Sequence, residues 1–270
     1  MDNPISFMSA NYVAREVGYA MTGGWGQGDK ATSESFRPTP TFGERFGAIL
    51  ADVRALGFKA IDLWTAHLSP TWATDEHIAT AREELDKYDL TVPSLGGWFG
   101  SSPGEFEASC KLAAALGVPI LGGSTSMLEK DRAFVVDRLE HYGLKLGLEN
   151  HPEKNPEETL AKIGDGGGGT LGTTIDTGWY GTQGYGAAEA TERLGEHLLY
   201  VHLKDVLEVG EHRTCRYGQG VVPIRACVEA LRRVGYTGAI CVEHEPELYD
   251  PSEDCRANLA MLRDWMGQDA

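Results

Sequence analysis

The strongest constraint on the fold is a regular alternation of short apolar runs with amphipathic stretches, which continues from about residue 43 to the end of the chain. The apolar runs are rich in β-branched residues and end in glycine, polar or acidic residues, as strands of parallel βαβ units do. The pattern predicts eight strands, at Ile5–Met8, Ala60–Trp64, Thr91–Leu95, Pro119–Gly122, Lys145–Glu149, Thr173–Asp176, Leu198–Lys204 and Ala239–Glu243.

Amphipathic stretches with helix start and stop signals follow the strands. Several end at a glycine, and three begin at a proline that suits the first helical turn. The predicted helices are Phe42–Leu56, Asp75–Lys87, Glu105–Leu116, Asp131–Tyr142, Pro156–Ile163, Ala187–Leu194, Pro223–Val234 and Pro251–Met266.

Eight parallel strands alternating with eight helices close naturally into a (β/α)₈ barrel, which typically takes about 250 residues. The chain has 270 residues, so we expect one domain over residues 1–270. The alternative is an open, doubly wound sheet. It is disfavoured because no G-x-G-x-x-G follows the first strand and because polar strand ends are spread over the later strands.

Three connections are longer or more unusual than a barrel scaffold needs. Residues 13–41 and 206–222 both follow strands, so they belong to the end of the barrel where active sites are built, and we expect them to act as lids. The four glycines at 166–169 precede a strand, so we expect a flexible tether at the opposite end. Lid residues with suitable side chains to cover a substrate are Trp25, Phe36, Arg213, Arg216 and Tyr217.

Each of the last four strands ends in a side chain that can bind a metal ion: Glu149, Asp176, His202 and Glu243. In a closed barrel, one suitably phased residue per strand converges with its neighbours at the carboxyl end. Three carboxylates and an imidazole suit manganese first, with magnesium, cobalt or zinc as alternatives, and leave coordination positions free for a substrate. A cation would also let the three carboxylates stay ionised together.

From about Gly57 to the C-terminus the chain resembles the sugar phosphate isomerase/epimerase group of xylose isomerase-like TIM barrels. The motifs that carry the resemblance are Gly-Phe-Lys-Ala-Ile-Asp-Leu, Gly-Leu-Glu-Asn-His, Ile-Asp-Thr-Gly-Trp, His-Leu-Lys-Asp and Val-Glu-His-Glu. The resemblance implies a divalent ion on the same four residues. It also implies proton transfer next to the carbonyl of a sugar or keto sugar, with Glu149 and Glu243 as acid and base.

The chain departs from the ketose 3-epimerases of this group at three positions, where it has Trp179, Glu208 and Asn155 instead of their His, Arg and Glu. It has His151 instead, two residues beyond Glu149 and therefore on the same side of the strand. This histidine is a candidate base outside the ligand set. The arrangement resembles the metal-bearing subunit of C-glycoside deglycosidases, and inosose dehydratases are a further relative, so a lyase or deglycosidase subunit is the alternative function.

Further candidates for substrate contact lie at or just past the strand ends. Lys204 is a candidate partner of a substrate oxyanion, Asp205 an orienter of the following loop, and Glu245 an acceptor for a sugar hydroxyl or a partner of His151. We expect His244 to point toward the helices instead. Aromatic side chains able to contact a sugar ring are Trp64, His67, Trp98 and Trp179, and Arg216 is a further candidate.

The charge balance limits the kinds of partner that this protein can bind. With 24 Lys+Arg against 40 Asp+Glu the formal net charge is −16, which opposes nucleic acid and anionic membranes. An apurinic-site endonuclease of the same fold would also need more histidines than the 8 present. We expect a small carbohydrate substrate and a homo-oligomer or a second subunit. A barrel subunit with a purely structural metal is the non-enzymatic alternative.

The five cysteines lack close pairing, and no basic leader or long apolar segment is found, so we expect reduced thiols and a cytoplasmic location.

Overall fold

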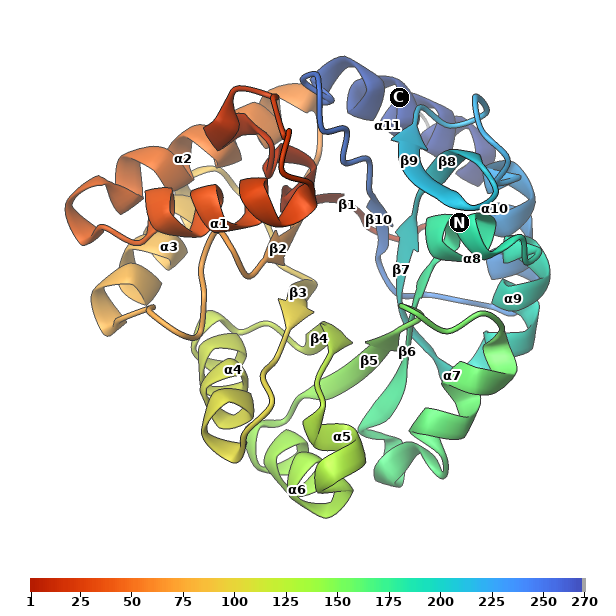
Figure 1. The fold of residues 1–270 in the computed structure, drawn as a ribbon, viewed down its shortest axis with the longest axis horizontal. Helices are drawn as coiled ribbons and strands as arrows, with labels where there is room; N and C mark the ends of the chain where they lie inside the picture. The colour runs from red at the N-terminus through yellow and green to blue at the C-terminus, as the bar shows by residue number, and fades with distance from the viewer. Residues whose placement is uncertain (269–270) are drawn as a thin grey trace.

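The predicted barrel is confirmed. The structure is a computed structural model that describes residues 1–268. Within them, eight parallel strands close into a barrel in the order β1-β10-β7-β6-β5-β4-β3-β2 (Figure 1). Its strands are β1 Ile5–Met8, β2 Ala60–Trp64, β3 Ser94–Trp98, β4 Ile120–Ser124, β5 Lys145–Glu149, β6 Leu171–Asp176, β7 Leu198–Leu203 and β10 Ile240–Val242.

Helices surround the strands, as the view down the barrel shows (Figure 1). They are α2 Thr39–Leu56, α3 Asp75–Lys87, α4 Pro103–Leu116, α5 Met127–Lys130, α6 Arg132–Tyr142, α7 Pro156–Ile163, α8 Thr177–Gln183, α9 Ala187–Leu194, α10 Ile224–Arg233 and α11 Ser252–Met266. Among residues 1–268, no helix has both the length and the apolar character needed to cross a bilayer.

Successive side chains along each strand face either the surrounding helices or the inside of the barrel. Phe7, Ile61 and Val201 belong to the main apolar core that packs against the helices. Their strand neighbours Ser6 and Tyr200 share a hydrogen bond of 2.6 Å between hydroxyl oxygens. Because successive side chains of a strand point to opposite faces, the polar set lies inside the barrel. The interior is therefore polar enough to hold ionisable groups.

The third strand begins later than the sequence predicts, at Ser94 instead of Thr91. Thr91 forms only an isolated bridge with Ala60. Pro93 stands between this bridge and the strand, and a proline cannot donate to a sheet ladder. The strand ends at Trp98, three residues beyond the predicted end.

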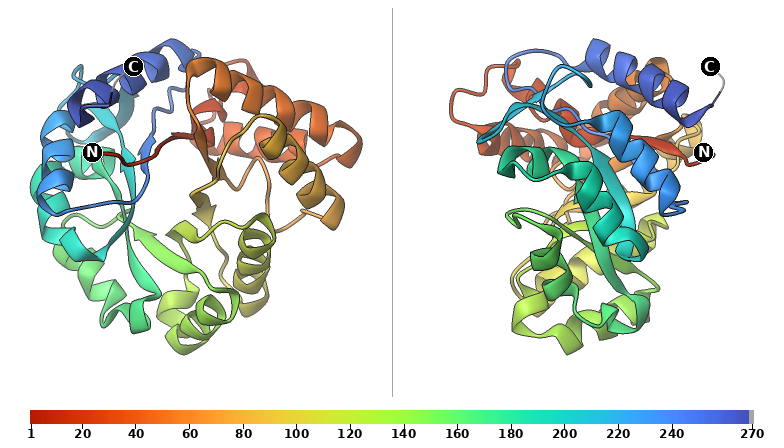
Figure 2. Two further views of the ribbon diagram at one scale, coloured as in Figure 1. Left: turned by 180° about the vertical axis from the view of Figure 1, so that it is seen from behind. Right: turned by 90° about the vertical axis from the view of Figure 1, so that its right-hand side faces the viewer.

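The two segments predicted as lids contain regular structure that the sequence pattern did not predict. Residues 13–41 include the short 3₁₀ helix η2 Arg15–Val17 and the helix α1 Trp25–Phe36, and residues 206–222 include most of an antiparallel hairpin, β8 Asp205–Glu208 with β9 Glu211–Cys215. Both project from one end of the barrel, opposite the two chain termini (Figure 2).

The helix α1 has a weak helical pattern because it contains two glycines, which have low helix propensity. Close contact with the preceding segment of the chain explains why residue 28 is a glycine. A Cβ built there would lie 2.4 Å from Met21 Sδ and 2.7 Å from the Val13 carbonyl oxygen. Thr32 Oγ1 also donates a hydrogen bond of 3.1 Å to that carbonyl. Packing against the 13–21 segment, rather than local propensity, therefore stabilises α1.

The glycine run forms the 3₁₀ turn η3 Gly166–Gly169 between α7 and β6. Gly167 and Gly168 have φ values of 52° and 67°, which other residues rarely adopt. The Asp165 side chain accepts a hydrogen bond of 3.0 Å from the Gly167 amide. The run thus forms a hydrogen-bonded turn, where the sequence pattern predicted a flexible tether.

Candidate metal centre

Four strands deliver the four predicted ligands to one point. Glu149 and Asp176 are the last residues of β5 and β6, His202 lies in β7, and Glu243 follows β10. One ligand atom from each lies within 4.8 Å of those of the other three. His202 Nδ1 lies 2.9 Å from Glu149 Oε1 and 3.2 Å from Glu243 Oε2. The four side chains therefore form a candidate buried metal site.

The donor set fits a divalent cation. Glu243 Oε2 is buried and accepts no hydrogen bond from residues 1–268. Burial raises the pKa of Glu243 well above its ordinary value. Burial alone would lower the pKa of His202, but nearby Glu243 and the carboxylates bonded to its ring raise it well above 6.5. Without a cation the group holds protons, which a divalent ion would displace.

Lys204 is buried beside the four ligands. Its Nζ lies 2.9 Å from Asp176 Oδ2, 3.0 Å from Glu243 Oε1 and 3.2 Å from Glu245 Oε2. Burial alone would lower the pKa of this amine, but Asp176 and the two glutamates raise it well above its ordinary value. Lys204 therefore stays cationic and offsets part of the negative charge.

Buried polar residues that follow neighbouring strands hold the ligands in place. Asn150 Oδ1 accepts from the Asp176 amide at 2.7 Å, and Asn150 Nδ2 donates to the Asp176 carbonyl at 2.9 Å. Asn11 bridges the residues on either side of Glu243, donating to the Val242 carbonyl and accepting from the His244 amide. Asp176 Oδ1 caps α8 by accepting from Gly178 N at 2.7 Å, so only Oδ2 faces Lys204.

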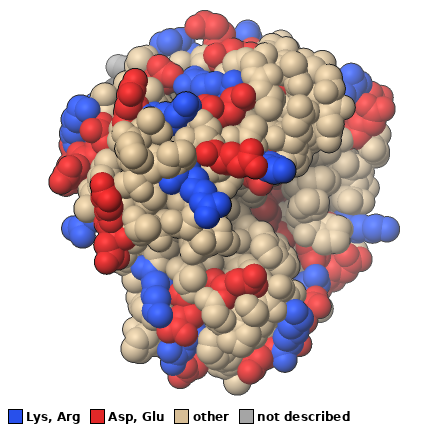
Figure 3. Space-filling view, turned by 60° about the vertical axis from the view of Figure 1, so that its left-hand side comes forward, with Lys and Arg blue, Asp and Glu red and all other residues tan. Residues whose placement is uncertain are grey.

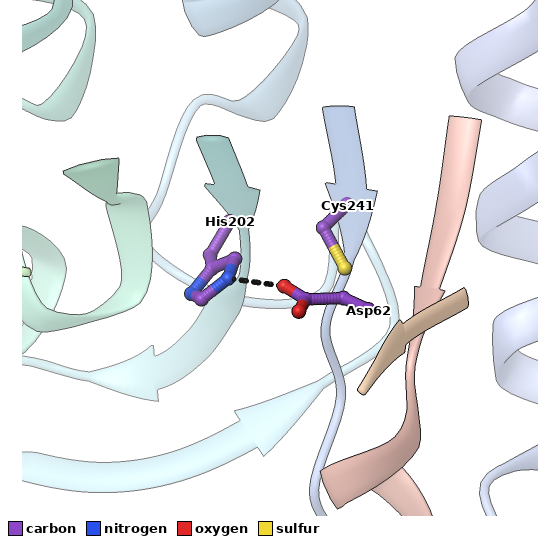
Figure 4. A group of neighbouring side chains, drawn as sticks. All are labelled: Asp62, His202 and Cys241. Carbon is purple, nitrogen blue, oxygen red and sulfur yellow. Dashed lines mark hydrogen bonds and ion pairs between the residues drawn. The ribbon is translucent and has the colours of Figure 1, made fainter. Parts of the chain in front are cut away.

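Asp62, inside the barrel on β2, orients His202. It lies 2.8 Å from His202 Nε2 through Oδ2 (Figure 4). A bond from Nε2–H to a carboxylate fixes the ring and leaves Nδ1 to face Glu149 and Glu243. Cys241 pairs with His202 in the sheet register and lies beside Asp62 in the same view. Burial raises the pKa of its thiol well above 9, which makes it a poor ligand.

We expect Asp62→Asn to weaken manganese binding by roughly tenfold, because the neutral amide holds the imidazole less firmly and makes Nδ1 less basic. Calorimetric titration of the metal-free protein measures this affinity. Asp62, His202 and Cys241 also lie close enough to hold an ion, so Cys241→Ser is the matched control. Unchanged affinity in Asp62→Asn, or an equal loss in Cys241→Ser, would contradict the assignment.

A pocket of about 620 Å³ opens above the four ligands. Of the predicted substrate contacts, Trp64, Trp179, Lys204 and Glu245 line it, as do the predicted base His151 and the predicted lid residues Trp25 and Arg213. The Trp179 ring is stacked between two imidazoles, 3.8 Å from that of His151 and 3.7 Å from that of His212. Burial and the charge of Lys204 lower the pKa of His212 to about 3, so it is neutral. The pocket wall thus carries two histidines.

Three other predicted contacts lie outside the pocket lining. Trp98 is 54% exposed at the end of β3. His67 is buried against Phe36, with Nδ1 3.2 Å from Ser9 Oγ. Asp205 is buried and accepts hydrogen bonds from the backbone amides of 218, 220 and 222, which hold the loop after the hairpin.

Arg216 also lies away from the pocket lining. Its Nε donates to Asp254 Oδ1 of α11 at 2.7 Å. The other oxygen of Asp254 lies 3.1 Å from His244 Nε2, so His244 does point toward the helices. His244 Nδ1 lies 3.0 Å from Thr214 Oγ1 on the hairpin, and Tyr249 OH lies 3.0 Å from His244 Nε2. This cluster joins the hairpin, the loop after β10 and α11.

His67 gives the fold a measurable pH dependence. Burial lowers its pKa to about 3, whereas an unfolded histidine has a pKa near 6.5. The unfolded chain therefore binds a proton that the folded chain refuses, and stability is lost as the pH falls from 6.5 toward 3. The expected loss is about 1.4 kcal/mol per pH unit for this one group.

Urea unfolding of His67→Asn should accordingly show a shallower loss of stability between pH 6 and 4 than the unmodified protein. The exposed His141 offers the control His141→Asn, which should keep the original slope. Equal slopes in all three proteins would show that His67 does not titrate in this way.

Sequence reasoning missed Asp62, Asn11, Asn150 and His212. Asp62 left a signal, because a single carboxylate inside the run Ala-Ile-Asp-Leu-Trp must point into the barrel if its apolar neighbours face the helices. Asn150 stands directly after Glu149 but resembles an ordinary loop residue. The position of His212 depends on the hairpin, which the pattern did not predict.

Comparison with known proteins agrees with this architecture. Residues 50–265 match the xylose isomerase-like TIM barrel family. L-ribulose-5-phosphate 3-epimerase UlaE from Escherichia coli is 36% identical over 70 residues, which are 26% of this chain and 23% of that protein. The chain covers less than half the length of the curated relatives it matches first.

Two solved structures share the fold over almost the whole chain. A xylose isomerase-like TIM barrel protein from Mycobacterium smegmatis in complex with magnesium superposes with a TM-score of 0.71 and 19% identity, covering 98% of this chain and 97% of its own. The 3-keto-D-glucoside 4-epimerase YcjR from E. coli has a TM-score of 0.66 and 17% identity, covering 97% and 100%. With the family match spanning most of the sequence, this chain belongs to the xylose isomerase-like TIM barrel family.

Proposed function

We propose that this protein is a divalent-metal-dependent enzyme that moves a proton at the carbon next to the carbonyl of a sugar or keto sugar, as isomerases and epimerases do. The observation that carries the proposal is the convergence of Glu149, Asp176, His202 and Glu243 at one point, with Glu149 and Glu243 also lining the pocket. The names of the relatives support the reaction class, because UlaE and YcjR are both epimerases.

Glu149, Asp176, His202 and Glu243 would hold the ion, with manganese as the first choice and magnesium, cobalt or zinc as alternatives. When bound, it supplies a positive charge that polarises the substrate carbonyl and lowers the energy of the enediolate. The three carboxylates of the set balance that charge.

The proton transfer itself needs groups of this chain. Glu149 ends β5 and Glu243 follows β10, and β6 and β7 separate these two strands in the barrel, so the two carboxylates would approach a bound sugar from two sides. One carboxylate takes the proton from the carbon, and the electron pair moves onto the carbonyl oxygen. Return of a proton to the same carbon from the opposite face, by the other carboxylate, gives epimerisation. Return of the proton to the former carbonyl carbon, with the hydroxyl proton passing to the former carbonyl oxygen, gives isomerisation. Lys204 Nζ, which already contacts Asp176, Glu243 and Glu245, would contribute its positive charge near the oxygen that gains charge.

A lyase or deglycosidase reaction is the second candidate, and His151 favours it. The imidazole lies on the pocket wall outside the ligand set, stacked on Trp179. From the same enediolate, expulsion of a group at the next carbon needs a proton on the departing atom. His151 in its protonated form is the acid we assign to that step, and as the free base it is a candidate for the first proton abstraction.

The test is deuterium washout in H₂O from keto sugars that carry deuterium at the carbon next to the carbonyl, with the manganese-loaded protein, followed by NMR. Exchange at the carbon next to the carbonyl that stops with a chelator supports the proposal, and the product separates epimerisation from elimination. No exchange from any tested ketohexose or 3-keto sugar would overturn it.

We expect His151→Ala to slow elimination at least tenfold. The exposed His141→Ala is the control, and unchanged washout and elimination in His151→Ala would remove His151 from the mechanism.

A further inference from the structure

The walls of the pocket differ sharply from its floor. The floor consists of charged groups at the strand ends, including Glu149, Lys204 and Glu243. The upper walls come from α1, the end of β2, the hairpin strand β8 and the loop after β10. Their side chains are mainly apolar: Trp25, Trp64, Leu207, Pro246, Leu248 and Tyr249. We infer that these upper walls form a subsite for an uncharged, flat apolar group attached to the sugar. The inference rests on the proposed function of the floor.

The polar atoms of two wall aromatics are already engaged elsewhere. Trp64 Nε1 donates a hydrogen bond of 2.7 Å to Asp29 Oδ1. The Tyr249 hydroxyl lies 3.0 Å from His244 Nε2 and 3.1 Å from Asp254 Oδ2. Both residues therefore present ring surface, not hydrogen-bonding groups, to the pocket. The Trp25 ring packs edge-to-face on Trp64 at 5.3 Å and extends this surface.

Three exposed apolar side chains gather at the rim of this pocket, as they do at ligand-binding grooves. Leu248 is 71% exposed, Tyr249 45% and Leu207 40%. Because they stand on two separate segments that face one pocket, a ligand between them would cover all three. A free sugar bound to the polar floor would leave this surface in contact with water.

The charges argue against a phosphate as the additional group. Four carboxylates line the pocket, those of Glu149, Glu243, Glu245 and Glu247. In the part of the chain that the structure describes, the cations of the lining are Lys204, which contacts three carboxylates, and Arg213, which pairs with Glu208 and Glu211. Neither is free to bind a phosphate dianion. The face of the molecule drawn in Figure 3 carries charges of both signs mixed together, without a basic patch.

The size of the cavity agrees with a substituted sugar. At about 620 Å³ it lies within the range of pockets that bury drug-sized ligands, which exceed a single hexose. The aromatic faces suit a flat ring, which stacks on or against them at favourable distances. The ligand class is thus a neutral glycoside or keto sugar that carries an aromatic group.

The test uses the manganese-loaded protein and calorimetric titration with the phenyl glycosides of glucose, galactose and mannose, beside the free sugars and their 6-phosphates. We expect at least one phenyl glycoside to bind tenfold or more tighter than its parent sugar and the 6-phosphates to bind weakest. Equal affinity for phenyl glycoside and parent sugar, tightest binding of a 6-phosphate, or no binding of any phenyl glycoside would overturn the inference.

Two variants test whether the tighter binding of the phenyl glycoside depends on the pocket wall. Leu248→Ser should reduce the affinity for the phenyl glycoside about fivefold without changing free-sugar binding or the melting temperature. Val209→Ser is the matched control, because Val209 is 59% exposed at the tip of the hairpin and outside the pocket lining. Equal behaviour of the two variants would contradict the subsite.

These outcomes are distinguishable from failure of the proposed function. Binding is measured at equilibrium without turnover, so a preference for phenyl glycosides with no deuterium washout would reject the proton-transfer chemistry and keep the subsite. Washout from free keto sugars with no preference for the phenyl group would keep the proton-transfer chemistry and reject the subsite.

Discussion

The Glu243→Gln variant should lose at least a thousandfold of metal-dependent proton exchange while remaining folded. The change removes one charge from the cation site and one of the two carboxylates assigned to proton transfer, so two contributions are lost together. The amide keeps the shape of the side chain and can still accept from Lys204 Nζ, which lies 3.0 Å from Glu243 Oε1. The fold should therefore survive.

Deuterium washout with saturating manganese measures proton exchange, and the circular dichroism spectrum measures separately whether the variant is folded. Glu247→Gln is the matched control, since Glu247 lines the same pocket but lies outside the group of four ligands. It should keep at least half of the exchange rate. A Glu243→Gln protein that retains a tenth of the original rate would be incompatible with the assigned role. Parallel loss of activity and melting temperature would favour a structural metal instead.

The second large effect concerns the ion itself. We expect saturating manganese to raise the melting temperature of the metal-free protein by about 10 °C. An ion present at a thousandfold excess over its Kd contributes about 4 kcal/mol, and each kcal/mol shifts the melting temperature of a domain of this size by about 2–4 °C. The physical reason is that the ion offsets the mutual repulsion of Glu149, Asp176 and Glu243.

Lys204 limits the rise in melting temperature that the ion causes. Its ammonium already offsets part of the repulsion among the carboxylates when no ion is bound. Differential scanning calorimetry before and after chelation gives the shift, and Glu243→Gln should show less than a third of it. No shift with manganese, magnesium, cobalt or zinc would exclude a divalent ion from this group of residues.

The barrel itself could be predicted from the sequence because strand and helix periodicity differ and repeat eight times. The convergence of Glu149, Asp176, His202 and Glu243 could be predicted for the same reason, since residues at equivalent ends of parallel strands must meet. The exact strand limits depended on single residues such as Pro93, whose effect on the ladder is local.

The rest could not be predicted, because it depends on contacts between distant segments. The helix α1 is stabilised by the approach of Gly28 to the Val13 carbonyl, which no propensity reveals. The role of Lys204 depends on three carboxylates that stand on two other strand ends. Arg216 has the chemistry of a substrate contact, but the position of Asp254 on α11 draws it away from the pocket.

The cluster of Arg216, Asp254, His244, Thr214 and Tyr249 has a consequence for how the pocket works. Together with Asp205, which holds three amides of the following loop, it anchors the base of the hairpin and the loop after β10 to the barrel. These walls are preorganised, so a ligand that fits them loses little affinity to the entropy of ordering loops. Selection among sugars would then depend on the fixed shape of the opening, and not on which sugar can drive a closure.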